Sequence, residues 1–344
     1  MRILRSRPRR APDRPGVASA RFTWTFVILC GWLMAGAYLD AWHHHNLTSP
    51  ETSPFTPYHF LLYAAEAAIG VFLGINVVRN FLRYGTWDEL LPDGYGVSLL
   101  GSVLFGIGGV LDLMWHLRFG VELSVAALFS PTHLLLMLSG GLIVSGPLRA
   151  AFRRAGDVAP LSAVASAALT LSMFTFFAQF DQPLIQRWAA GVSAVTISPR
   201  YMQEELGMLG LILYATVLSA MLVVCLRRFA LPLGSVTAIL VINGALVSSV
   251  EEHTELVAVS VIAGIVGDAL LFILRPSPGR RDAFRLFAFS VPLELTAIYI
   301  GFLSATTGVW WETPVWSGAP LVAGVIGWML SFVALPDEPA TARA

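Results

Sequence analysis

The sequence contains no lysine, so all 22 of its basic residues are arginines. Charged residues of both signs make up only 13% of the 344 residues, and the net charge is zero. A nucleic-acid partner is not expected, because binding to a phosphate backbone depends on an excess of basic residues. The two cysteines, Cys30 and Cys225, lie in apolar segments. They exclude a disulfide framework and argue against a cysteine-based metal site.

Apolar residues, by contrast, make up 56% of the chain. This composition describes a polytopic protein of a lipid bilayer rather than a soluble domain. The apolar residues fall into about ten segments of spanning length, separated by short polar turns, which predicts an all-α membrane helical bundle. The ten expected transmembrane helices are 22–40, 58–78, 95–113, 131–148, 159–180, 207–226, 231–250, 254–274, 286–305 and 318–336.

We expect four regions along the chain. Residues 1–21 form a disordered basic tail, and residues 337–344 form a second, short tail. Residues 22–148 form a four-helix half that carries a duplicated motif, and residues 149–336 form a C-terminal helical half of unknown role. A cleavable signal is the competing interpretation of the N-terminus, but the apolar run that follows is long enough to span and no convincing cleavage site follows it.

The arginines predict the orientation in the membrane. If the N-terminus is cytoplasmic, only Arg118, Arg187 and Arg200 of the 22 arginines fall outside, which leaves 19 inside. Both termini are therefore expected in the cytoplasm, with the chain in a bacterial-type plasma (inner) membrane. All seven histidines then lie at the outer, periplasmic ends of helices or in outer loops. The chemistry is accordingly expected at the outer face.

A polar motif that is unusual in so apolar a chain begins at Asp40. His44 follows four residues later, and the sequence T-P-Y-H-F-L-L at 56–62 then supplies His59. Glu51 lies between the two histidines, and a tryptophan lies near the first. Ionisable groups are costly near lipid, so a constellation of this kind indicates function.

The motif occurs a second time, beginning at Asp112. His116 follows at the same spacing, S-P-T-H-L-L-L at 130–136 supplies His133, and Glu122 lies between the two histidines. Hydrogen-bonded helix ends need not recur with the same companions, so the duplication favours metal binding over a structural cap. The first and third expected helices both run outward, and the second and fourth both return. This parallel repeat places its two copies at equal depth, either side by side or merged into one dinuclear centre.

Each copy supplies ligands from both limbs of a helix–loop–helix. The aspartate and the first histidine share one helical face, and the second histidine follows a proline at the start of the returning helix. One carboxylate and two imidazoles suit copper, iron or zinc and leave positions open for water, oxygen or substrate. The expected metal ligands are Asp40, His44, His59, Asp112, His116 and His133.

These residues resemble the integral-membrane C subunit of the particulate methane and ammonia monooxygenases, the copper membrane monooxygenases. The resemblance covers about residues 35–145. That subunit also carries two successive sites, of which the first has D-x3-H followed by F-T-P-x-H, as at 55–59 here. The second has asparagine where this chain has Asp112, and the spacers between histidines are longer here, at 14 and 16 residues. The resemblance implies bound copper, oxygen activation at one site and an assembly of several subunits.

The leading hypothesis is a copper-dependent membrane oxidoreductase of monooxygenase type. One or two ions would act with O2 on a small apolar substrate from the bilayer, with Glu51 and Glu122 as catalytic proton donors or as groups that orient the ligands. An external electron donor is required, because the chain has no haem, flavin or iron–sulfur motif. Further subunits or a second copy of the chain are candidate partners. The alternatives are a non-catalytic protein that acquires or transports copper or another metal, and a zinc-dependent membrane hydrolase.

Other ionisable residues have two interpretations each. The group at 251–255, which includes His253, could add ligands or form a solvated helix start. Glu66, seven residues after the second histidine of the first copy, could orient an imidazole or be a buried hydrogen-bonded acid. Asp268 and Glu294 could form a proton relay deeper in the bilayer, although interhelical hydrogen bonding is the commoner role.

Overall fold

The helical class expected from the sequence is confirmed for the described part of the chain. The computed structural model describes residues 16–46, 56–85, 90–120, 125–154, 156–191 and 200–336. Every element in these ranges is a helix, and β-structure there is limited to isolated bridges. In chain order the elements are α1 (Ala20–His45), α2 (Pro57–Tyr84), α3 (Gly96–Phe119), α4 (Val125–Phe129), α5 (Pro131–Val144), α6 (Gly146–Phe152), α7 (Leu161–Phe177), α8 (Pro183–Gln186), α9 (Arg200–Arg228), α10 (Ser235–Ser248), η2 (Thr254–Leu256), α11 (Val257–Leu274), α12 (Arg281–Thr306) and α13 (Thr313–Ala334).

The lengths and compositions of these helices are those of a membrane protein. Seven of the described helices are long and apolar enough to cross a bilayer, and α5 with α6, bent by 48°, makes an eighth if counted as one span. α7 and α10 are apolar but have only 17 and 14 residues, about 26 and 21 Å of helix against a hydrocarbon core of about 30 Å. The expected number of ten spans therefore stays a prediction.

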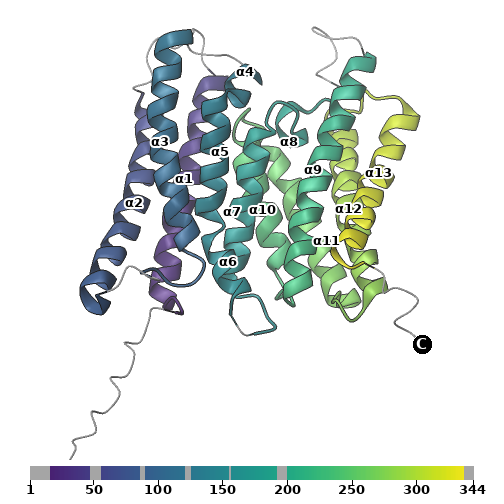
Figure 1. Ribbon diagram of the computed structural model, residues 1–344. Coiled ribbons are helices and arrows are strands. Elements are labelled where there is room, and N and C mark those ends of the chain that lie inside the picture. The colour runs from purple at the N-terminus through teal and green to yellow at the C-terminus, as the bar shows by residue number, and fades with distance from the viewer. Residues whose placement is uncertain are drawn as a thin grey trace, which may run out of the picture.

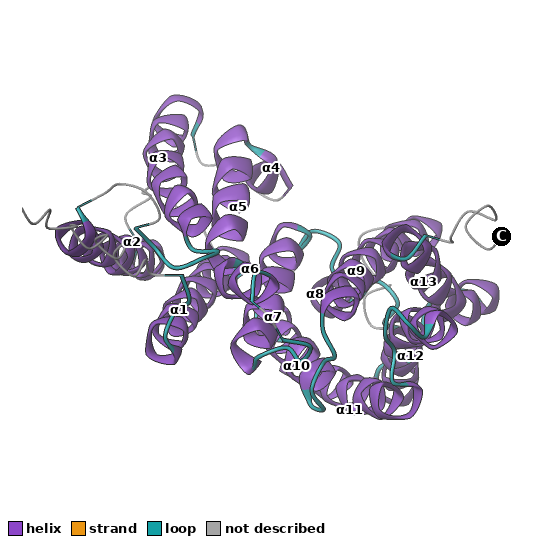
Figure 2. Ribbon diagram, turned by 60° about the horizontal axis from the view of Figure 1, so that its bottom comes forward, coloured by secondary structure: helices purple, strands orange, loops and turns teal. Residues whose placement is uncertain are grey.

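The helices stand side by side with their axes roughly aligned (Figure 1). α1, α2, α3 and α5 lie at one side of the molecule, α7 and α10 in the middle, and α9, α11, α12 and α13 at the other side (Figure 2). α7 is rich in alanine and serine and buries most of its side chains, because it contacts α1, α5, α6, α9 and α10. A single apolar core therefore extends from Phe26 of α1 to Ala319 of α13.

α2 and α5 begin in the same way, and this start positions a histidine in each. Thr56 and Ser130 are the N-cap residues, and the side-chain oxygen of each accepts a hydrogen bond from the backbone N–H three residues later. A proline occupies the first helical position, where its fixed φ suits the helix and no N–H is required. His59 and His133 consequently lie in the first turn of their helices.

Glycine residues bring the two helices of each pair close together. A Cβ added to Gly101 of α3 would lie 2.8 Å from the backbone carbonyl oxygen of Ser139 on α5. A Cβ added to Gly36 of α1 would lie 3.2 Å from the Cα of Leu62 on α2. Backbones that approach this closely allow side chains from both helices of a pair to reach one small space.

The end of the bundle opposite the histidines is rich in arginine. There Arg149 donates hydrogen bonds to the carbonyl oxygen of Leu142 at 2.7 Å and to Oγ of Ser98 at 2.9 Å, and Arg154 donates to the carbonyl oxygen of Ala18 at 2.9 Å. These bonds join helix ends on one side of the bundle. The arginines at this end of the bundle thus help to hold the fold together. The orientation of this end in the membrane stays a prediction.

Candidate metal centres

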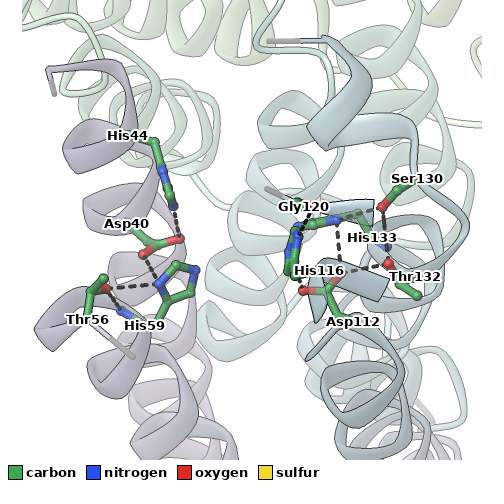
Figure 3. Close-up of polar contacts among 10 residues, drawn as sticks. All are labelled: Asp40, His44, Thr56, His59, Asp112, His116, Gly120, Ser130, Thr132 and His133. Carbon is green, nitrogen blue, oxygen red and sulfur yellow. Dashed lines mark hydrogen bonds and ion pairs between the residues drawn. The ribbon is translucent and has the colours of Figure 1, made fainter. Parts of the chain in front are cut away.

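Asp40, His44 and His59 meet where α1 ends and α2 begins (Figure 3). Nε2 of His44 lies 3.6 Å from Oδ2 of Asp40, and Nδ1 of His59 lies 3.4 Å from Oδ1 of the same carboxylate. The aspartate therefore lies between two imidazoles, whose ring centroids are 5.3 Å apart. One candidate ligand atom from each of the three residues lies within 4.8 Å of the other two, so a single ion could contact all three.

Asp112, His116 and His133 form the same arrangement where α3 ends and α5 begins (Figure 3). Nε2 of His116 lies 3.2 Å from Oδ2 of Asp112, and Nδ1 of His133 lies 3.2 Å from Oδ1. The ring centroids are 5.8 Å apart, and the candidate ligand atoms again lie within 4.8 Å of one another. The two triads thus use the same atoms of the same residue types, and all six sequence-predicted ligands fall into them.

The helix caps also hold the second histidine of each triad. Oγ1 of Thr56 lies 2.9 Å from Nδ1 of His59, and Oγ of Ser130 lies 2.7 Å from Nδ1 of His133. Each hydroxyl therefore contacts both the backbone and the ring of one histidine. The [ST]-P-x-H pattern is explained by this geometry, because the hydroxyl that starts the helix also fixes the imidazole.

The second triad has further hydrogen bonds around its ligands. Nδ1 of His116 lies 3.2 Å from the carbonyl oxygen of Gly120, so the ring donates there and turns Nε2 towards Asp112. Oγ1 of Thr132 donates to Oδ1 of Asp112 at 2.6 Å. Metal-binding histidines and carboxylates are usually oriented by such outer bonds. Tyr58 occupies the position of this threonine in the first triad.

The distances within both triads suit a shared metal ion. Two atoms bound tetrahedrally to one ion at about 2.1 Å lie about 3.4 Å apart. The contacts of Asp40 and Asp112 with Nε2 of His44 and His116 are 3.6 and 3.2 Å long, on either side of that separation. Nδ1 of His59 and of His133 contacts the cap hydroxyl, so the other ring nitrogen would be the ligand atom of these two residues. Asp40 and Asp112 are only 14% and 13% exposed, while His44 is 32% exposed, so a ligand can reach the site from one side. Copper, zinc and iron all accept this donor set.

The triads are two groups and not one among the residues that the structure describes. Tyr63 of α2 lies beside the first triad, where its ring stacks against His59 with centroids 6.0 Å apart. A separate hydrogen bond joins α2 to α3: Oγ of Ser102 on α3 donates to Oε1 of Glu66 on α2 at 2.5 Å.

Comparison of the chain with family models, curated proteins and solved structures found no match. The resemblance to the monooxygenase C subunit therefore rests on the motif residues themselves. The two triads supply the geometry on which a function can be argued.

The two glutamates predicted as catalytic groups, Glu51 and Glu122, lie outside the described residues. Glu66, in contrast, is buried and accepts the hydrogen bond from Ser102. The structure therefore gives Glu66 the role of an acid that links α2 to α3. It does not hydrogen-bond a ligand imidazole within the contacts found for it.

The acidic residues between α10 and α11 contact α1 and Arg187 and do not extend the triads. Oε1 of Glu251 lies 2.6 Å from Nδ1 of His45, and Oε1 of Glu252 accepts a hydrogen bond from Nε1 of Trp42 at 3.1 Å. Glu255 accepts a hydrogen bond from Arg187 at 3.1 Å. The 251–255 group thus fastens the end of α1 to the other half of the molecule.

His253 lies among these residues, 4.0 Å from a carboxylate oxygen of Glu255. Its partial burial lowers the pKa of the imidazole, and the nearby Arg187 lowers it further. A neutral imidazole is therefore favoured at this position. His253 is not a member of either group of candidate ligands in the described residues.

Asp268 has a structural role in the fold. Its two carboxylate oxygens accept hydrogen bonds from the backbone N–H groups of Val236 and Thr237, at 3.1 and 3.0 Å, and from Oγ1 of Thr237 at 2.6 Å. The carboxylate thus binds the start of α10, where the helix dipole favours negative charge. Among the described residues, no hydrogen bond connects it to Glu294, so the structure does not join these two acids into a relay.

Asp181, which follows α7, is a buried acid that the sequence pattern did not single out. It is 1% exposed, and Oδ1 accepts a hydrogen bond from Nε1 of Trp188 at 2.8 Å. Burial raises the pKa of this carboxyl to about 7 from an ordinary value of 3.8, although the Trp188 bond opposes the rise. An isolated aspartate in a short polar segment carries no motif, so only the packing reveals it.

We expect Asp181→Asn to stabilise the detergent-solubilised protein at about pH 8 by about 3–6 °C in melting temperature. The folded state binds this proton more tightly than the unfolded state, so wild-type stability falls as the pH rises from about 4 to about 7. Asparagine removes the charge and keeps the bond from Trp188. The gain should be much smaller at about pH 4, and exposed Asp157→Asn is the matched control. An equal gain at both pH values would contradict the assignment.

Proposed function

We propose that this chain is an integral membrane metalloprotein that binds two copper ions in its Asp–His–His triads and acts as a monooxygenase-type oxidoreductase. The observation that carries the proposal is the recurrence of one atomic arrangement at two places in the fold. Six ionisable side chains from four helices converge in two matching groups, although such groups are costly near lipid.

The described residues have definite tasks in this proposal. Asp40 and Asp112 supply the negative charge that holds a cation between two neutral imidazoles. Thr56 and Ser130 orient the second histidine of each site, and the ring of Tyr63 stacks on His59 of the first site. Bound copper would supply the redox chemistry with O2, with electrons from an external donor. The donor set alone also accepts iron or zinc, and the resemblance of the motif favours copper.

An apolar substrate would reach the sites from the bilayer. Phe60 of α2, next to His59, is 73% exposed, and Met114 of α3, between the two ligands of that helix, is 60% exposed. Such exposed apolar side chains at a spanning helix face lipid, in which a small apolar molecule concentrates. The substrate would therefore arrive without crossing the aqueous face.

Two further elements of the proposal concern topology. The matching contacts of the α1–α2 and α3–α5 pairs support a parallel repeat, which places both sites at one depth. The concentration of arginine at the opposite end supports cytoplasmic termini and sites at the outer face of a plasma membrane. Counting the bent α5–α6 pair, α7 and α10 as spans gives the ten helices of the proposed topology.

The metal content of gently purified protein tests the proposal most directly. We expect two equivalents of copper per chain in the wild type and none in the double variant His59→Ala/His133→Ala, because each site loses one of its three ligands. Replacing two histidines outside the triads, His43→Ala/His253→Ala, is the matched control and should leave both equivalents. Zinc in place of copper would favour hydrolysis by a metal-bound water, and absence of metal from every preparation would reject the proposal.

A further inference from the structure

A groove of about 550 Å³ lies between α12 and α13 near the arginine-rich end of the bundle. Most of its walls are apolar. On each helix the apolar lining residues are three, four or seven positions apart, so they form one stripe along that helix. The apolar lining consists of Leu286, Phe289, Val325, Trp328 and Phe332. This face is separate from both metal triads, which belong to α1, α2, α3 and α5.

The groove results from how the two helices pack. A Cβ on Gly324 would lie 2.8 Å from the ring of Phe289, and Gly327 lies against the backbone carbonyl of Ala288. The backbones are therefore in contact along one line. Larger side chains beside that line form the walls of the groove, and two of them, Leu286 and Trp328, are 50% and 45% exposed.

Two residues of opposite charge also line the groove. Asp282 is in the first turn of α12, and Arg285 follows three residues later on the same face. The guanidinium carbon of Arg285 lies 3.9 Å from the centroid of the Phe332 ring, which holds the cation over the groove. A guanidinium has five N–H donors, so Arg285 can bind ligand oxygens and keep its contacts within the protein.

We propose that this groove binds a phospholipid whose headgroup carries both a phosphate and an ammonium group, as phosphatidylethanolamine does. An acyl chain would lie along the apolar walls, the phosphate would accept hydrogen bonds from Arg285, and the ammonium would donate to Asp282. Trp328 would contact the interfacial region, which tryptophan prefers. A purely acidic headgroup would meet the negative charge of Asp282, and a choline headgroup has no N–H to donate to it.

The proposal can be tested by native mass spectrometry of the full chain after delipidation and incubation with one lipid at a time. We expect phosphatidylethanolamine to remain bound at lower lipid concentration than phosphatidylglycerol or phosphatidylcholine. Arg285→Gln should weaken its retention about tenfold, or about 1.4 kcal/mol. Arg83→Gln removes the same charge at the same end of the bundle beside Tyr84 and should leave retention unchanged.

Two more variants separate the parts of the site. Val325→Trp fills the groove without a change of charge and should also lower retention about tenfold, and Asp282→Asn should remove the preference for phosphatidylethanolamine over phosphatidylglycerol. Equal losses in Arg285→Gln and Arg83→Gln would overturn the proposal, because general charge would then explain binding. Displacement of the lipid by inorganic phosphate alone would also overturn it, by showing a site for a free anion. Metal content should stay constant throughout, so the outcome is distinct from that of the proposed function.

Discussion

Replacing Asp112 by alanine is expected to remove the metal ion from the second triad and leave the first triad loaded, so that metal content falls from two equivalents per chain to one. The carboxylate lies between His116 and His133 and is the charged member of the triad. Its loss leaves two neutral imidazoles. Removal even of a residue that merely orients a ligand lowers metal affinity about 10–100-fold. We expect removal of a direct ligand to lower the affinity at least about 100-fold. Metal analysis of the purified variant measures the result.

Asp40→Ala should give the mirror result, with the second triad loaded and the first empty. Asp93→Ala is the control, because Asp93 is an exposed acid at the arginine-rich end, 3.9 Å from Arg153. Loss of both ions from either single variant would show one coupled centre in place of two sites. Two equivalents of metal in the double variant Asp40→Ala/Asp112→Ala would place the ions elsewhere and refute the ligand assignment.

Gly101→Leu is expected to destabilise the protein by about 3 kcal/mol or more, at the upper end of the effects of overpacking. A side chain at this position would collide with the backbone carbonyl of Ser139, which cannot move aside as a flexible side chain could. α3 would have to separate from α5, and Asp112 would move away from His133. We therefore expect both a lower melting temperature and loss of the second equivalent of metal.

Gly106→Leu is the matched control for this variant. Gly106 lies on the same helix, and a Cβ added there meets nothing within 4 Å. Leucine at this exposed position faces lipid and should leave the melting temperature and both equivalents of metal unchanged. If the two variants behave alike, helix propensity and not the α3–α5 approach sets the stability, and the account of the second site by close packing is wrong.

The meeting of the six residues in two groups could be predicted from the sequence because its signal is local. Asp112 and His116 share a helical face at a spacing of four residues, and a cap–Pro–x–His pattern fixes His133 at a helix start. Two copies of such a pattern specify which residues meet, provided that each pair of helices forms a hairpin. The fold class followed for the same reason, since apolar runs of spanning length need no knowledge of tertiary contacts.

The remaining features depend on contacts between distant segments. Nothing in the sequence around Glu251 and Glu252 shows that they contact His45 and Trp42, some 200 residues earlier. The bend between α5 and α6 also interrupts what the sequence shows as a single apolar run. There the backbone N–H of Ser145 donates to the carbonyl oxygen of Gly141 in α5, and α6 begins at the next residue. Asp268 looks like a buried charge in the sequence and is a helix cap in the fold, because its partners come from another helix.

The fastening of α1 to the segment between α10 and α11 makes the surroundings of the two triads unequal. Three bonds, from Trp42, His45 and Asn46, anchor the last turn of α1, which contains His44. The end of α3, by contrast, is exposed from Leu117 to Gly120. Any movement between the two halves of the molecule would therefore reach the first triad directly through α1, whereas the second triad is held by the local bonds of Thr132 and Gly120.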